Sequence, residues 1–157
     1  MDTNQVFTKI LIAVDGSKAS EKAAQKGLAL ASQLQVPVTL LSVIDRSQEI
    51  LQTDLEVKPI LTGTILEEQA QINLKRIIDS YVPSIMKEKV DKICLEGLPR
   101  EEILSKINSS KADLLIVGTQ ARKGIMHFLL GSTAEFLVRH AGIPVMVVPC
   151  NKTADVS

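Results

Sequence analysis

The sequence predicts an α/β fold, in which helices cover both faces of a five-stranded parallel sheet. Short apolar runs alternate with segments of helical spacing along the whole chain, which is the pattern of repeated strand–helix units. The apolar runs are nearly continuous rather than alternating, as expected for strands buried on both faces. Because crossovers between parallel strands are right-handed, these units give a doubly wound, Rossmann-like domain.

Length and composition fit one domain with a sizeable core. The chain has 157 residues, of which 45% are apolar and only 3% aromatic. The core is therefore built from Leu, Ile, Val and Ala. We expect a single domain over residues 1–157, with its core at about 7–150 and a frayed polar tail at 151–157.

Charge and hydropathy argue against nucleic acid or a membrane as a partner. Eighteen basic residues balance eighteen acidic ones, so no net positive field attracts a phosphate polymer. No apolar run approaches the ~20 residues of a membrane helix. The first residues lack the basic region and apolar segment of a signal peptide. Since Cys94 and Cys150 fit no metal-binding spacing, we expect free thiols and a cytoplasmic location.

The first half of the chain predicts two strands and two helices. Residues 8–14 and 38–45 form strands, and residues 19–34 form an amphipathic helix with small residues toward the sheet. Residues 45–61 are polar and irregular, as in a lid, an interaction segment or a mobile loop, with a short helical piece at 48–52. Residues 62–82 form a helix with one apolar face for the core and one charged face for solvent.

A short polar turn, Asp15-Gly16-Ser17, follows the first strand. Ser17 is in position to cap the next helix. Asp15 lies at the carboxyl end of its strand. It can simply fold the turn or serve as a functional carboxylate, and the pattern alone leaves both roles open.

The second half predicts three strands and two helices. Residues 90–96 form a strand, residues 97–99 a turn, and residues 100–108 a helix that Pro99 helps to begin. An apolar strand, 114–117, then ends at Gly118 and leads into a loop with two cations. A helix opens at Gly131 and ends near Gly142, and the strand Val145–Val148 closes the unit.

The loop before the last helix has the chemistry of an anion site. A helix N-terminus presents unpaired N–H groups and partial positive charge. Gly131 leaves room for close approach of an anion, and Ser132 and Thr133 add hydroxyl donors. Gly118 offers similar room at the end of its strand. Alternatively, these residues form only a turn and a helix cap, and the spacing leaves the two interpretations about equal.

These residues resemble the nucleotide loop of the universal stress protein family, whose pattern is G-x-x-G, nine residues, then G and Ser or Thr. Here Gly118-x-x-Ala121 is followed, after nine residues, by Gly131-Ser132. The segments KILIAVDGS, TLLSVID, LLIVGT and LLGSTAEFLVRHAGIPVMVV extend the resemblance over nearly the whole chain. The second glycine is replaced by Ala121, which costs roughly 1 kcal/mol or more if that position needs a positive φ.

The resemblance implies an adenine nucleotide alpha hydrolase-like fold with strand order 3-2-1-4-5. Winding then reverses between strands 1 and 4, so the ligand crevice lies between Asp15 and Gly118, with the 97–99 turn at its rim. The resemblance also implies a site for ATP, ADP or AMP, with or without Mg²⁺, and a homodimer through the Val145–Val148 edge strand. The candidate nucleotide-binding residues are Ala13, Val14, Asp15, Val43, Gly118, Ala121, Arg122, Gly131, Ser132 and Thr133. By pattern alone, Val43 is also consistent with plain core packing, and Arg122 with a solvated loop cation that adds charge for phosphate only if it faces the site.

Three functions fit these observations. The first is an ATP-binding protein with a regulatory or stress-response role. The second is a dimeric interaction module that binds no nucleotide, which the substitution at Ala121 keeps open. The third and least favoured is a slow ATP hydrolase. Since the sequence has no GxxxxGK[ST] loop, no Ser/His/Asp arrangement and no metal-ligand cluster, we assign no catalytic and no metal-binding residue.

Overall fold

The computed structural model describes residues 4–46, 59–120 and 130–150, which form one five-stranded parallel sheet with the strand order β3-β2-β1-β4-β5. This confirms the predicted fold class and order. The elements are β1 (Ile10–Val14), α1 (Lys18–Leu34), β2 (Val38–Ile44), α2 (Pro59–Tyr81), the 3₁₀ helix η2 (Ser84–Lys89), β3 (Val90–Glu96), α3 (Pro99–Ser110), β4 (Leu114–Gln120), α4 (Ser132–His140) and β5 (Val145–Cys150).

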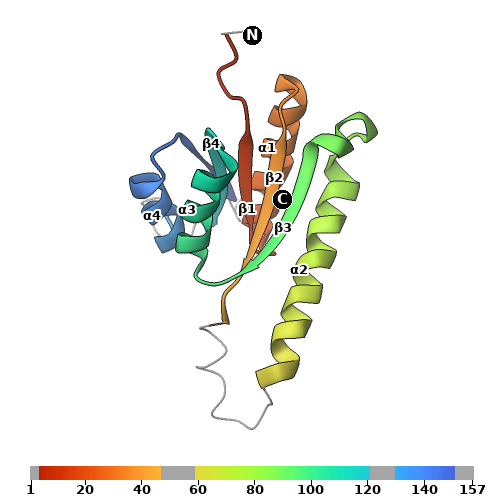
Figure 1. Ribbon diagram of the computed structural model, residues 1–157, viewed down its shortest axis with the longest axis vertical. Coiled ribbons are helices and arrows are strands. Elements are labelled where there is room, and N and C mark those ends of the chain that lie inside the picture. Colours follow the sequence, from red (N-terminus) through yellow and green to blue (C-terminus); the bar gives the residue numbers. More distant parts are fainter. Residues whose placement is uncertain (1–3, 47–58, 121–129, 151–157) are drawn as a thin grey trace, which may run out of the picture.

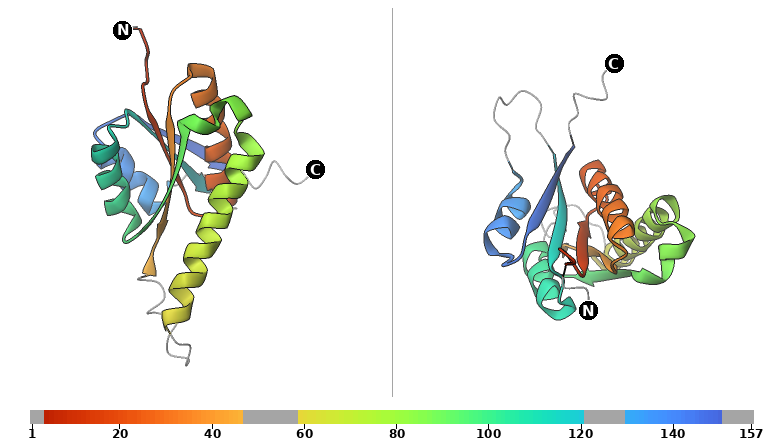
Figure 2. Two further views of the ribbon diagram at one scale, coloured as in Figure 1. Left: turned by 45° about the vertical axis from the view of Figure 1, so that its right-hand side comes forward. Right: turned by 90° about the horizontal axis from the view of Figure 1, so that it is seen from above.

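Helices cover both faces of the sheet, as Figures 1 and 2 show. Successive residues of β1 enter opposite cores, because side chains alternate along a strand. Ile10 and Ile12 pack in the core under α1 and α2, and Leu11 packs in the core under α3 and α4. This two-sided burial explains why the strands read as continuous apolar runs.

Small residues bring α1 close to the sheet, as its sequence predicts. Ala23, Ala24, Gly27 and Ala31 are all buried on the face of α1 that meets β1 and β4.

Among the described helices, none is both long enough and apolar enough to cross a bilayer.

Several element boundaries differ from the sequence prediction. The helix predicted at 62–82 begins at Pro59, so the last residues of the predicted 45–61 loop are helical. The strand expected to end at Gly118 continues to Gln120, because β5 pairs with it along its whole length, up to Cys150. The predicted helical piece at 48–52, the tail at 151–157, and both Ala121 and Arg122 lie outside the described residues.

Candidate functional site

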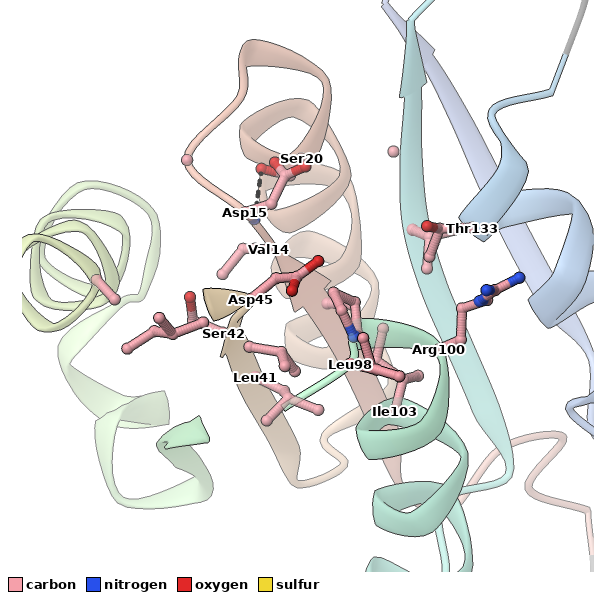
Figure 3. A pocket seen from close by; sticks show the side chains of 18 of the residues that line it. Val14, Asp15, Ser20, Leu41, Ser42, Asp45, Leu98, Arg100, Ile103 and Thr133 are labelled. Carbon is pink, nitrogen blue, oxygen red and sulfur yellow. Dashed lines mark hydrogen bonds between the residues drawn. The ribbon is translucent and has the colours of Figure 1, made fainter. Parts of the chain in front are cut away.

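A cavity of about 960 Å³ opens at the carboxyl ends of β1, β2 and β4. Winding of the sheet reverses between β1 and β4, so this is the topological switch point where open α/β sheets bind ligands. The volume lies within the range of small-molecule sites. Figure 3 shows the labelled lining residues, which come from both sides of the sheet.

The structure brings most of the predicted site residues together in this cavity. Gly131 lies at its margin and is not part of the lining. Ala121 and Arg122 fall outside the described residues. The predicted residues that line the cavity are Ala13, Val14, Asp15, Val43, Gly118, Ser132 and Thr133.

Asp15 folds the turn after β1 and also lines the cavity, so the two roles left open by the sequence are compatible. Its Oδ1 accepts a hydrogen bond from the Ser17 N–H (2.9 Å), and its own N–H donates to the Ser20 Oγ (3.2 Å). Burial alone raises the pKa of this carboxyl, but the hydrogen bonds from Ser17 and Ser20 outweigh burial, and the pKa is lowered. Asp15 is therefore an anion at neutral pH.

The turn is held from the α1 side by Ser17, which is the predicted N-cap. The Ser17 Oγ accepts a hydrogen bond from the Ser20 N–H at 3.2 Å. Ser20, which also lines the cavity, is itself buried and donates its hydroxyl to the Ser17 carbonyl at 3.0 Å. The start of α1 is thus a rigid part of the cavity wall.

Gly118 allows β4 to pack against the first turn of α1. A Cβ at this position would stand 2.3 Å from the Ala19 carbonyl oxygen and 2.7 Å from the Ser20 nitrogen. These are backbone atoms, and moving them would disturb the packing of α1 on the sheet. The protein's own packing therefore accounts for this glycine, whether or not a ligand also approaches it.

The first turn of α4 brings hydroxyl groups to the cavity. Gly131 is the N-cap residue and provides no side-chain cap, so the sequence interpretation of Ser132 and Thr133 as a simple cap is not what the structure contains. Ser132 and Thr133 both line the cavity. A Cβ on Gly131 would meet nothing within 4 Å among the described atoms. The Gly131 N–H donates a hydrogen bond to the Thr119 Oγ1 (3.4 Å), whereas no described residue accepts from the Ser132 and Thr133 N–H groups. An anion can therefore bind these two amides.

The middle of α2 forms a wall that sequence analysis missed. The helix was predicted as core and solvated face, but four of its residues line the cavity. The length of α2 could have indicated this wall. Its 23 residues span roughly 34 Å, whereas the seven residues of β2 span only about 23 Å. The first turns of α2 therefore project past the carboxyl edge of the sheet (Figure 1). The four lining residues are Leu66, Gln69, Ala70 and Asn73.

A surface network fixes the orientation of the Asn73 amide. Arg76 donates to both carboxylate oxygens of Glu21 (2.9 and 3.0 Å) and to the Asn73 Oδ1 (2.9 Å). Tyr81 also donates to Glu21 (2.8 Å). Because a guanidinium has no acceptor, the amide oxygen of Asn73 must face Arg76. The amide N–H groups of Asn73 are then the ones available to the cavity.

The turn between β3 and α3 supplies the remaining rim. Leu98, Pro99 and Arg100 line the cavity, in agreement with the rim position that the resemblance implied. Pro99 begins α3 as expected. Sequence analysis gave Arg100 no role beyond starting this helix. No group of three or more His, Cys, Asp or Glu side chains that could hold a metal occurs within the described parts of the chain.

Comparison with known proteins identifies the family. The Universal stress protein family model matches residues 7–149. The chain belongs to the universal stress protein family. It is 32% identical over 143 residues to Universal stress protein MJ0531 of Methanocaldococcus jannaschii, covering 91% of this chain and 82% of the relative. Universal stress protein YxiE of Bacillus subtilis is 26% identical over 150 residues, covering 91% of this chain and 99% of the relative.

Solved structures of the universal stress protein family have the same fold. The structure of MJ0577 of Methanocaldococcus jannaschii matches with a TM-score of 0.71 and 26% identity, covering 91% of this chain and 96% of that one. A universal stress protein in complex with cAMP matches with a TM-score of 0.58, covering 91% of this chain and 97% of that one. At 16% identity, the second likeness is evidence for the fold alone.

Proposed function

We propose that this universal stress protein binds ATP, or another adenine nucleotide, in the cavity and has a regulatory or stress-response role. The observation that carries the proposal is the pairing of the first turn of α4 with Asp15 across the switch-point cavity. One end offers hydroxyls and helix amides to phosphate, and the other offers a carboxylate to hydroxyl or amino groups. A universal stress protein of the same fold has been solved in complex with cAMP, which is itself an adenine nucleotide. A cytoplasmic location stays a prediction.

The described residues fit the parts of a nucleotide. The phosphates lie at Ser132 and Thr133, whose hydroxyls and first-turn amides donate to their oxygens. The base lies against apolar residues at the end of β2, with Val43 among them. Asp15 accepts hydrogen bonds from the ribose or from an amino group of the base. Mg²⁺, when present, is held mainly by phosphate oxygens and water.

We further propose a homodimer through β5. This strand lies at the edge of the sheet and pairs only with β4 among the described strands. Met146 is 39% exposed on it. An apolar strand edge that stays unpaired favours association with another chain, and the same edge of a second copy is a complementary partner.

The test begins with the purified protein. It is denatured, and any released small molecule is identified by absorbance and mass. ATP is then titrated into the stripped protein by calorimetry, with and without Mg²⁺. We expect saturable binding, and we expect the double variant Gly131→Val, Ser132→Ala to abolish it while leaving the circular dichroism spectrum unchanged. Unchanged ATP affinity in this variant would place the phosphates elsewhere.

A second candidate function is an interaction module that binds no nucleotide. It is favoured by Ala121, which stands where the family pattern has glycine. Absence of both released nucleotide and ATP binding would favour this candidate, and the dimer surface would then be the place to seek partners. A slow ATP hydrolase is the weakest candidate, because a phosphate cradle alone gives only limited electrostatic help.

A further inference from the structure

Arg100 differs from the other described arginines in having no carboxylate partner among the described residues. Its guanidinium carbon lies 5.1 Å from the centroid of the Phe136 ring, in a cation–π contact. The other described arginines form ion pairs: Arg46 with Glu96 (3.0 Å), Arg76 with Glu21 (2.9 Å) and Arg139 with Glu135 (3.1 Å).

The contact with Phe136 does not use the N–H donors of Arg100, which is exposed, so these donors are available to a ligand in place of water. A cation–π contact satisfies charge, but the five N–H donors of a guanidinium need acceptor oxygens. No acceptor for them occurs within the described parts of the chain. Planar anions with two oxygens, such as carboxylate and phosphate, match this set of donors best.

The position of Arg100 directs these donors to one end of the cavity. Arg100 is the only cationic side chain in the described lining, which also includes the carboxylates of Asp15 and Asp45. Figure 3 shows Arg100 and Thr133 on one side of the cavity, with the guanidinium directed toward α4, and Asp15 and Asp45 on the other side. The cavity therefore separates positive from negative charge, and its positive end lies on the side of α4, where Thr133 also lines the cavity.

We propose that Arg100 binds a phosphate group of the nucleotide and makes the site prefer nucleotides over the uncharged nucleoside. This inference rests on the proposed nucleotide-binding function and adds to it a residue outside the glycine loop. An exposed cation–π contact is weaker than a bidentate, charge-assisted hydrogen bond. Phosphate therefore displaces Phe136 as the partner of the guanidinium, or shares it with the ring.

Calorimetry with ATP and adenosine on the stripped full-length protein tests this assignment. We expect Arg100→Gln to weaken ATP binding roughly ten- to a hundredfold, the loss of one or two hydrogen bonds between charged groups. Adenosine affinity stays within about twofold, since its interactions do not involve phosphate. Arg100→Lys keeps the positive charge but loses the planar guanidinium. We expect its ATP affinity to lie between those of the wild type and Arg100→Gln.

Arg139→Gln is the matched control. Like Arg100→Gln, it removes one positive charge. Arg139, however, lies on α4, pairs with Glu135 and does not line the cavity. We expect its ATP affinity to equal that of the wild type. If the wild type binds ATP and Arg100→Gln binds it equally well, the role of Arg100 is overturned and the proposed function stands. An equal loss of ATP and adenosine binding in Arg100→Gln would overturn phosphate recognition. If the wild type binds neither ligand, the proposed function and this inference both fall.

Discussion

A Cβ atom on Gly118 would stand 2.3 Å from the carbonyl oxygen of Ala19. The end of β4 and the first turn of α1 are therefore in backbone contact at the floor of the cavity. This contact fixes the turn that carries Asp15 relative to the strand that leads toward α4. The geometry of the site thus depends on Gly118. Its backbone conformation is one that any residue can adopt, so glycine is required because a side chain would collide with α1.

We predict that Gly118→Ala destabilises the fold by about 1–3 kcal/mol, the usual cost of overpacking a tight interior. Urea unfolding followed by circular dichroism measures this cost. The matched control is Gly131→Ala, whose new Cβ meets nothing within 4 Å among the described residues. The control therefore loses at most about 1 kcal/mol, through poorer N-capping. Equal stability of the two variants would contradict the packing explanation.

Asp113 anchors the start of the sheet and makes stability depend on pH. Its carboxylate accepts hydrogen bonds from the Thr8 N–H (2.8 Å), the Thr8 hydroxyl (2.8 Å) and the Lys9 N–H (3.0 Å). Burial raises the pKa of Asp113, but these hydrogen bonds outweigh burial and lower it. Because the pKa is lower in the folded state, the stabilisation is full above the unfolded value of about 3.9. It is lost as the pH falls through the folded pKa.

We therefore predict that Asp113→Asn lowers the free energy of unfolding by about 1–2 kcal/mol at pH 7. The difference from the wild type shrinks as the pH falls below about 4, because the unfolded wild-type chain then binds a proton at Asp113 more readily than the folded protein does. Urea titrations at pH 7 and pH 3 measure both effects. Asp91→Asn is the control, because the Asp91 side chain is exposed and forms no ion pair or hydrogen bond with another described residue. A difference that stays constant with pH would rule out the charge as its source.

We predict that Asp15→Asn weakens ATP, AMP and adenosine binding by the same factor, roughly tenfold. An asparagine oxygen can still accept the Ser17 N–H, so the turn survives while the charge is lost. Calorimetry with the three ligands checks this, and Arg100→Gln provides the contrast, because its effect is limited to ligands with phosphate. If Asp15→Asn tightens ATP binding and leaves adenosine unchanged, Asp15 acts on the phosphates by repulsion and does not contact the nucleoside.

We predict that Met146→Glu converts a dimer into a monomer, because it places a charge on each copy of β5 at the shared edge. Size-exclusion chromatography with light scattering measures the change. Ile72→Glu is the control, since Ile72 is 67% exposed on α2, over the part of the sheet far from β5. A Met146→Glu protein that stays dimeric would place the interface elsewhere. A monomeric wild type would contradict the homodimer itself.

Local patterns in the sequence were enough to predict the five strands and four α-helices of the described chain, but not the 3₁₀ helix η2. The continuous apolar strands, the small-residue face of α1, and the Ser17 cap each follow from contacts within a few residues. The order of elements predicted a doubly wound sheet, and the family resemblance supplied the strand order. Asp15 and Ser132 could be flagged because each stands where an element ends, at the edge where parallel strands bind ligands.

Only the tertiary structure decided which distant segments meet. The middle of α2 became a cavity wall because the helix extends past the carboxyl edge of the sheet, whereas its periodicity alone indicated only a core face. Gly118 is explained by Ala19, about a hundred residues away in the sequence. Arg100 joined the site because α3 begins beside α4 on the same face. Periodicity reports which residues are buried, whereas contacts between elements depend on their lengths, the sheet's twist and side-chain packing.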